Sequence, residues 1–156
     1  MMIEEQIEND AAAKISAQAA QFASDNPGKA WFKSVQAIGQ YDIDFENVAD
    51  FVKTSPACLV EYGGESVEDL DNAGYQSRSE GRIYVYVVTH GLWTHKGTSD
   101  DAFALCRAIK NALRGQVYQG ADGVFGDYRY EAATPKVRND GGLLMRALQF
   151  CFRTID

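Results

Sequence analysis

The 156-residue chain is poor in the residues that carry most metal and redox chemistry. It has two histidines and three cysteines, and the cysteines are too widely spaced to form a CxxC pair. An odd number of isolated cysteines argues against a disulfide framework or a zinc ribbon. We therefore expect Cys58, Cys106 and Cys151 to be buried, reduced thiols, as in a cytoplasmic protein.

Long apolar runs and an excess of positive charge are also missing. No apolar run approaches the roughly 20 residues that span a bilayer, and residues 1–5 are acidic and lack the apolar segment of a signal peptide. The net charge is −7 and the isoelectric point about 4.8. Because nucleic acids and anionic membranes both demand basic patches, we expect neither to be the main partner.

The chain also lacks the motifs of covalent and acid–base catalysis. It has no Gly-x-Ser-x-Gly sequence, and Lys96-Gly97-Thr98 reverses the Gly-Lys-Thr order of a phosphate-binding loop. Its carboxylates are scattered, so no acid–base pair is indicated. We predict that the chain is not an enzyme and has no catalytic residue, no cofactor and no bound metal.

The main alternative involves the two histidines. His90 and His95 bracket a short loop, with Asp100 and Asp101 just downstream. Two imidazoles and a carboxylate can bind zinc, but a spacing of five fits neither a helical pair nor a zinc finger. A polar surface loop is the simpler interpretation. A small cytoplasmic enzyme or ligand-binding domain with a site near His90–His95 stays open as the alternative.

Two segments are apolar on almost every position. Residues 83–88 read Ile-Tyr-Val-Tyr-Val-Val, which predicts a central strand covered on both faces. Residues 143–155 alternate, which predicts a final strand with one apolar face. We expect the core to contain six side chains from these strands: Tyr84, Val85, Val87, Leu148, Phe150 and Phe152.

The remaining patterns predict an α+β fold. Helical periodicity indicates helices at 3–25, at about 44–53 and from Ser99 or Asp100 to about Arg114, with Phe103 facing inward. Shorter strands are predicted over three segments: 31–38, 57–62 and 128–132. A Gly-rich loop precedes the last of these. We expect one domain, 1–156, with a mixed and mostly antiparallel sheet of about five strands flanked by helices and a carboxy-terminal hairpin at 127–155.

A polar, acidic stretch lies between two predicted strands. Residues 63–81 form an exposed loop or a long hairpin arm, and connections of this length usually have a function or are disordered. Acidic side chains there can meet basic residues of a neighbouring subunit, in the loop before the last strand. The residues predicted to contact a partner are Glu65, Glu68, Asp69, Arg78, Lys136 and Arg138.

The order of these elements and several short phrases resemble a known family. The phrases are SPACLVEYGG at 55–64, RIYVYVVT at 82–89, AIKNALRG at 108–115 and LQFCF at 148–152. With the leading acidic helix, they resemble the Mu-like prophage tail proteins, which have the size and layout of phage tail terminators.

The resemblance implies a role in virion assembly. The family implies a ring, expected to be hexameric, that caps the tail tube and joins it to the head–tail connector. Tail tube and sheath proteins are then the other partners. Assembly in the host cytoplasm and a final place in the virion tail follow from the same resemblance, which brings no catalytic residue. A neck or head-completion protein of the same module is an alternative.

Overall fold

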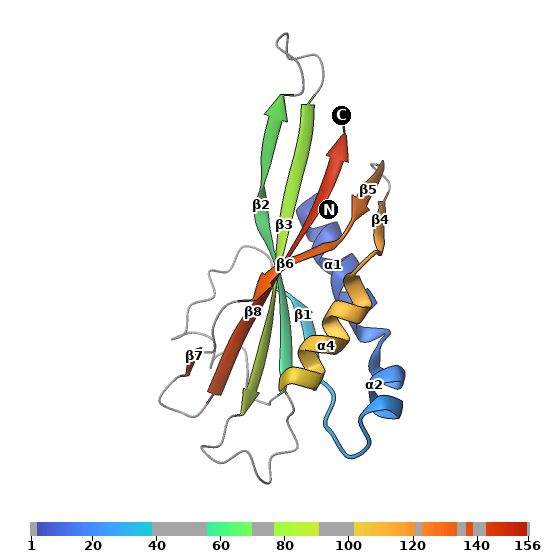
Figure 1. Ribbon diagram of the computed structural model, residues 1–156, viewed down its shortest axis with the longest axis vertical. Helices are drawn as coiled ribbons and strands as arrows, with labels where there is room; N and C mark the ends of the chain where they lie inside the picture. Colours follow the sequence, from blue (N-terminus) through green and yellow to red (C-terminus); the bar gives the residue numbers. More distant parts are fainter. Residues whose placement is uncertain are drawn as a thin grey trace.

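The computed structural model describes residues 3–38, 56–69, 77–90, 102–120, 123–133, 137–138 and 143–155. Its described helices are α1 (Ile3–Ser16), α2 (Ala19–Asp25) and α4 (Ala102–Leu113). The strands are β1 (Ser34–Ala37), β2 (Ala57–Asp69), β3 (Ser77–His90), β4 (Val117–Gly120), β5 (Gly123–Asp127), β6 (Arg129–Ala133), β7 (Val137–Arg138) and β8 (Leu143–Ile155). Figure 1 shows the helices beside a long sheet that extends beyond them at one end.

The sheet confirms the predicted α+β class and its mixed, mostly antiparallel character. The strand order is β1-β2-β3-β8-β6, with β7 also paired to β8. Only the β1–β2 pair is parallel among the described ladders, and the pairs formed by β3 and β8 are antiparallel. The strand predicted over 31–38 is shorter in the structure, and the boundaries predicted for the last strand match β8.

One face of the sheet carries the main core. Val85, Val87, Leu148, Phe150 and Phe152 are all buried, as predicted. They pack in one cluster with buried residues of α1, α2 and α4, among them Ile7, Ile15, Phe22, Leu105 and Ile109. The helices cover this face because α1 and α4 each present an apolar stripe to it and α2 contributes Phe22.

The opposite face is only partly covered, which corrects the prediction for Tyr84. Ala57, Leu59 and Val88 are buried there, but Tyr84 and Tyr86 are half-buried. Tyrosine carries an apolar ring and a polar hydroxyl, so it tolerates a position at the edge of a covered region. An alternating aromatic and aliphatic run thus does not distinguish a strand enclosed on both faces from one enclosed on a single face.

The amino-terminal helix predicted over 3–25 consists of two helices. The amide of Gln18 donates to the carbonyl of Ile15, three residues back, at 3.0 Å. This tighter turn separates α1 from α2, and Ile15 and Phe22 on either side of it are both buried. The break allows the chain to keep its apolar stripe on the core.

Other predictions changed or lie outside the described residues. The Gly-rich segment predicted as a loop before β6 contains a two-stranded sheet, β4–β5, whose ladder joins Val117 to Asp127. Such short ladders are difficult to predict in a segment of turn-forming residues, because backbone hydrogen bonds, not side chains, define them. The helix predicted at 44–53 and the proposed caps Ser99 and Asp100 lie outside the described residues.

In the segment 63–81, which we call the arm, the described residues 63–69 and 77–81 belong to paired strands, as in the predicted hairpin alternative. The β2–β3 ladder resumes after a bulge and pairs Glu65 with Gly81 through to Asp69 with Ser77. The end of β8 joins it, since Arg78 pairs with Ile155. Figure 1 shows these three strands projecting past the helices.

Glycines mark the base of the arm. A Cβ on Gly81 would lie 2.3 Å from the ring of Phe152, and one on Gly63 would lie 2.3 Å from the ring of Tyr84. Gly64 has a positive φ of 102°, which favours glycine. The sequence Gly63-Gly64 therefore supplies both the irregular backbone of the bulge and the room for an aromatic ring above the strand.

Candidate functional site

The predicted contact residues fall into two groups. Glu65, Glu68, Asp69 and Arg78 belong to the arm, and the register places Glu68 directly opposite Arg78. Arg138 lies in β7 and pairs with Leu144. Lys136 lies outside the described residues.

The alternative site near the two histidines is not assembled within the part of the chain that the structure describes. His90 is the last residue of β3 and pairs with Leu143 at the start of β8. His95, Asp100 and Asp101 lie outside the described residues.

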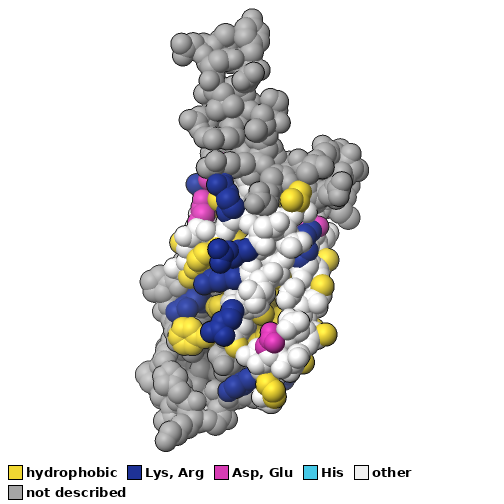
Figure 2. Space-filling model, turned by 45° about the vertical axis from the view of Figure 1, so that its right-hand side comes forward, with side chains coloured by type: hydrophobic (Ala, Val, Ile, Leu, Met, Phe, Trp, Pro, Cys, Tyr) yellow, Lys and Arg dark blue, Asp and Glu magenta, His cyan; other side chains and the backbone are white. Residues whose placement is uncertain are grey.

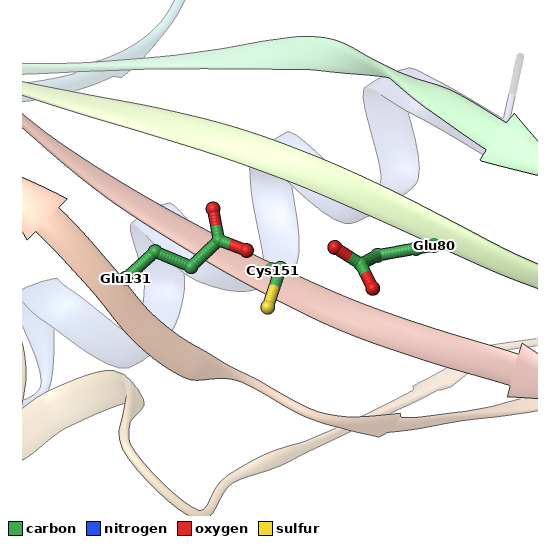
Figure 3. A group of neighbouring side chains, drawn as sticks. All are labelled: Glu80, Glu131 and Cys151. Atoms are coloured by element: carbon green, nitrogen blue, oxygen red, sulfur yellow. The ribbon is translucent and has the colours of Figure 1, made fainter.

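A cluster of polar side chains lies on the less covered face of the sheet. Figure 3 shows Glu80 of β3, Glu131 of β6 and Cys151 of β8 turned toward one another, and their possible ligand atoms lie within 4.8 Å of each other. Arg82 lies across from Cys151 in the β3–β8 register. Its guanidinium is 3.6 Å from a carboxylate oxygen of Glu80 and 3.6 Å from one of Glu131.

Hydrogen bonds and charge control the protonation of this cluster. Burial alone would raise the pKa of Glu131, but hydrogen bonds from Cys151 and Gln149 and the charge of Arg82 lower it overall. Burial, followed by the contact with Glu131, raises the pKa of the Cys151 thiol. The thiol therefore stays protonated and donates to an ionised carboxylate.

This arrangement suits a structural network better than a reactive site. A metal ion would need Cys151 as a thiolate, and Arg82 already supplies the positive charge between the two carboxylates. The residues come from β3, β6 and β8, so the network ties three strands together at the place where the arm begins.

The thiols follow the prediction made for them. Cys58, Cys106 and Cys151 are free and buried, and burial raises the pKa of the Cys58 thiol far above its ordinary value. Reactive cysteines are exposed and have a lowered pKa. The burial of these three residues is therefore typical of packed thiols.

A row of basic side chains lies on the outer surface of α4. Arg107, Lys110 and Arg114 follow Phe103 at steps of four, three and four residues, which places all four on one side of the helix. We call these three cations, together with Arg146 of β8, the basic strip. Figure 2 shows Lys and Arg side chains gathered on this face beside hydrophobic ones, with few acidic groups among them.

Aromatic rings hold two cations of the strip. The Nζ of Lys110 lies 4.3 Å from the ring centroid of Tyr130, and the guanidinium of Arg146 lies 5.6 Å from that of Phe103. Cation–π contacts of this kind orient a charge without neutralising it. Phe103 is 59% exposed, so the prediction that it faces the core is wrong.

The basic strip was not predicted from the sequence, although the spacing of its residues on α4 indicates it. Residues 103, 107, 110 and 114 are spaced as regularly as the residues of an apolar stripe. Phe103 was predicted to lie on the buried side of the helix, with the other apolar residues. The cluster of Glu80, Glu131 and Cys151 had no comparable signal, because strand pairing brings these residues together from distant parts of the chain.

Comparisons with solved structures give distant likenesses. No family model and no curated protein matches the chain. A chain from a solved structure described as the virion of a native gene transfer agent particle aligns with 93% of this chain and 94% of its own length, at 16% identity and a TM-score of 0.49. A likeness this distant does not assign a function. Among the described residues, no helix is long and apolar enough to cross a membrane.

Proposed function

We propose that the chain is a structural protein of a phage-like virion and acts as a tail terminator. In that role it forms a ring that caps the tail tube and joins it to the head–tail connector. The support is the resemblance of its sequence layout to Mu-like prophage tail proteins, together with the shape and surface chemistry of the fold. The proposed partners are other copies of the chain, tail tube and sheath proteins, and the connector.

The observation that carries this proposal is the arm. β2, β3 and β8 continue as a three-stranded ladder past the helices. The outer part of this ladder lies beyond the helices that cover the core, so a monomeric enzyme has no evident use for it. A subunit that must reach a neighbour gains a rigid, regular extension, since paired strands lose less entropy on binding than a free loop does.

The surface chemistry of the described residues supports a structural role over an enzymatic one. The polar cluster around Cys151 is an ion-paired network, and the thiols are buried. A hollow between α2 and α4 is lined by amide, carboxylate and guanidinium groups, including Gln18, Asp25, Arg107 and Asn111. These groups lack an activated nucleophile with its base, so we propose that the chain is not an enzyme.

Labelled imaging tests the tail role. A small tag at the carboxy terminus would be located by gold labelling in electron micrographs of assembled tails, with a tagged tube protein as the control that marks the full length. We expect label only at the head-proximal end. Label along the tail, or at its distal tip, would contradict the terminator assignment.

A further inference from the structure

The basic strip has the composition of a protein-binding surface. It contains three arginines and an exposed aromatic ring, Phe103, which are residue types enriched at interfaces. α4 contains no acidic residue, although the chain as a whole has a net charge of −7. Arg107 and Lys110 therefore have no acidic residue on their own helix, and Asp25 of α2 lines the same hollow as Arg107.

The strip is also partly ordered before any partner binds. Tyr130 and Phe103 hold Lys110 and Arg146, so these long side chains have less rotamer freedom to lose. Arginine binds carboxylates through two parallel hydrogen bonds. The fitting partner is an acidic segment that also brings an apolar side chain to Phe103.

We infer that the basic strip binds the acidic arm of a second copy of this chain, an inference that rests on the proposed ring. The arm strand reads Glu65-Ser66-Val67-Glu68-Asp69, three carboxylates with one valine. The four cations of the basic strip complement the negative charge of this strand. Exposed ion pairs set the register of such a contact more than its strength.

Arg146 of the strip and the outer end of the arm lie far apart along the sheet of one chain. Arg146 is opposite Val87 on β3, whereas Asp69 is opposite Ser77. The ten residues of β3 between these positions span about 33 Å at 3.3 Å per residue. A contact between Asp69 and Arg146 would therefore join two copies head to tail, and such an interface closes into a ring when the rotation between subunits permits.

Charge reversal tests this contact in the full-length chain. The strip variant carries Arg107→Glu and Lys110→Glu, and the arm variant carries Glu65→Lys and Glu68→Lys. Lys29→Glu with Lys33→Glu is the matched control, because both lysines are exposed and lie in the connection after α2. Light scattering over a concentration series would give the molar mass of each protein at ionic strengths of about 0.01 M and 1 M, where the Debye length is roughly 30 Å and 3 Å.

We expect the wild type and the control to associate at low salt and to do so less at high salt. Each reversed variant should associate at least about tenfold more weakly, because like charges then face each other. A mixture of the two reversed variants should regain association, since each supplies the charge that the other needs, and this recovery also shows that both are folded.

Three results would overturn the inference. The first is a wild type that is monomeric at every concentration and salt. The second is association of the reversed variants as strong as that of the control. The third is a mixture of the two reversed variants that does not regain association. A nucleic-acid surface would appear as loss of binding to a duplex DNA probe in the strip variant with self-association unchanged.

The inference and the tail role fail in different ways. If the mixture recovers but the label is absent from the head-proximal end, the interface stands and the terminator assignment is wrong. If the label is in place but charge reversal has no effect on association, only the interface is wrong.

Discussion

At the scale of single residues, Tyr128 links the amino-terminal helix to the sheet. It is 1% exposed, and its hydroxyl donates to the carboxylate of Asp10 at 3.0 Å. Asp10 also pairs with Lys14, one helical turn along α1. The ring of Tyr128 packs edge-on against Phe152 at 5.9 Å. A hydrogen bond and an aromatic contact from one side chain thus join α1 to β8.

Removing this hydroxyl should destabilise the fold. Tyr128→Phe keeps the ring but removes the donor to Oδ2 of Asp10, while Lys14 still donates to Oδ1, so we expect a loss of about 1–2 kcal/mol in the free energy of unfolding. Tyr130→Phe is the control, since it keeps the ring contacts with Phe150 and Lys110. Urea titration measures both. Equal losses in the two variants would show that the Asp10 contact contributes nothing.

Cys58 should make stability depend on pH. Burial raises the pKa of its thiol, so the folded chain keeps a proton that the unfolded chain loses near pH 8.5. This contribution is complete below that pH and is lost as the pH rises, by up to about 1.4 kcal/mol per pH unit. In Cys58→Ala the decline between pH 8.5 and 10 should be shallower by about that slope. Parallel curves for the two proteins in chemical denaturation would contradict this.

At the scale of elements, the periodicity of apolar residues predicts the features that depend on local structure alone. The alternation of Leu148, Phe150 and Phe152 is enough to predict β8 and its buried face, because period 2 is a direct property of a strand. It is not enough to predict how completely the other face is covered, which depends on residues distant in sequence. That is why Tyr84 was predicted to be more buried than it is.

The same limit applies to the candidate sites. Phe103 carries no mark that distinguishes it from a core residue of α4 except its spacing to Arg107 and Lys110. The network of Glu80, Arg82 and Glu131 depends on the register of three strands and on the bulge between Tyr130 and Ala132. A single sequence does not specify register at that precision.

Two phenylalanines test the difference between a core and a surface position. Phe150 is fully buried, so Phe150→Ala should cost about 3–5 kcal/mol of unfolding free energy. Phe103 is 59% exposed, so Phe103→Ala should cost less than about 1 kcal/mol. Denaturant titration gives both values. A loss below about 1 kcal/mol for Phe150→Ala would place that ring on the surface.

At the scale of the whole molecule, the arm and the rest of the fold, which we call the body, have different roles. The body contains the clusters of buried residues, and the arm contributes a ladder and charge. Replacing residues 66–79 by an Asn-Gly turn should therefore leave the body folded while removing the acidic partner of the basic strip. Thermal unfolding followed by circular dichroism should stay cooperative, and light scattering should show a monomer. Loss of the cooperative transition would show that the arm is part of the folding unit.

The outer edge of β2 has a consequence for solubility. Among the described strands, β1 pairs with β2 from Ala57 to Val60 only, so no described strand pairs with β2 on the side away from β3 over residues 65–69. Such an edge is a template on which identical chains stack without limit. The irregular backbone at Gly63-Gly64 interrupts this edge, and the acidic residues of the strand, Glu65, Glu68 and Asp69, give identical chains the same charge at the place where they would stack. The carboxylates of the arm would therefore be retained by selection against fibre formation even in a chain that never met a partner.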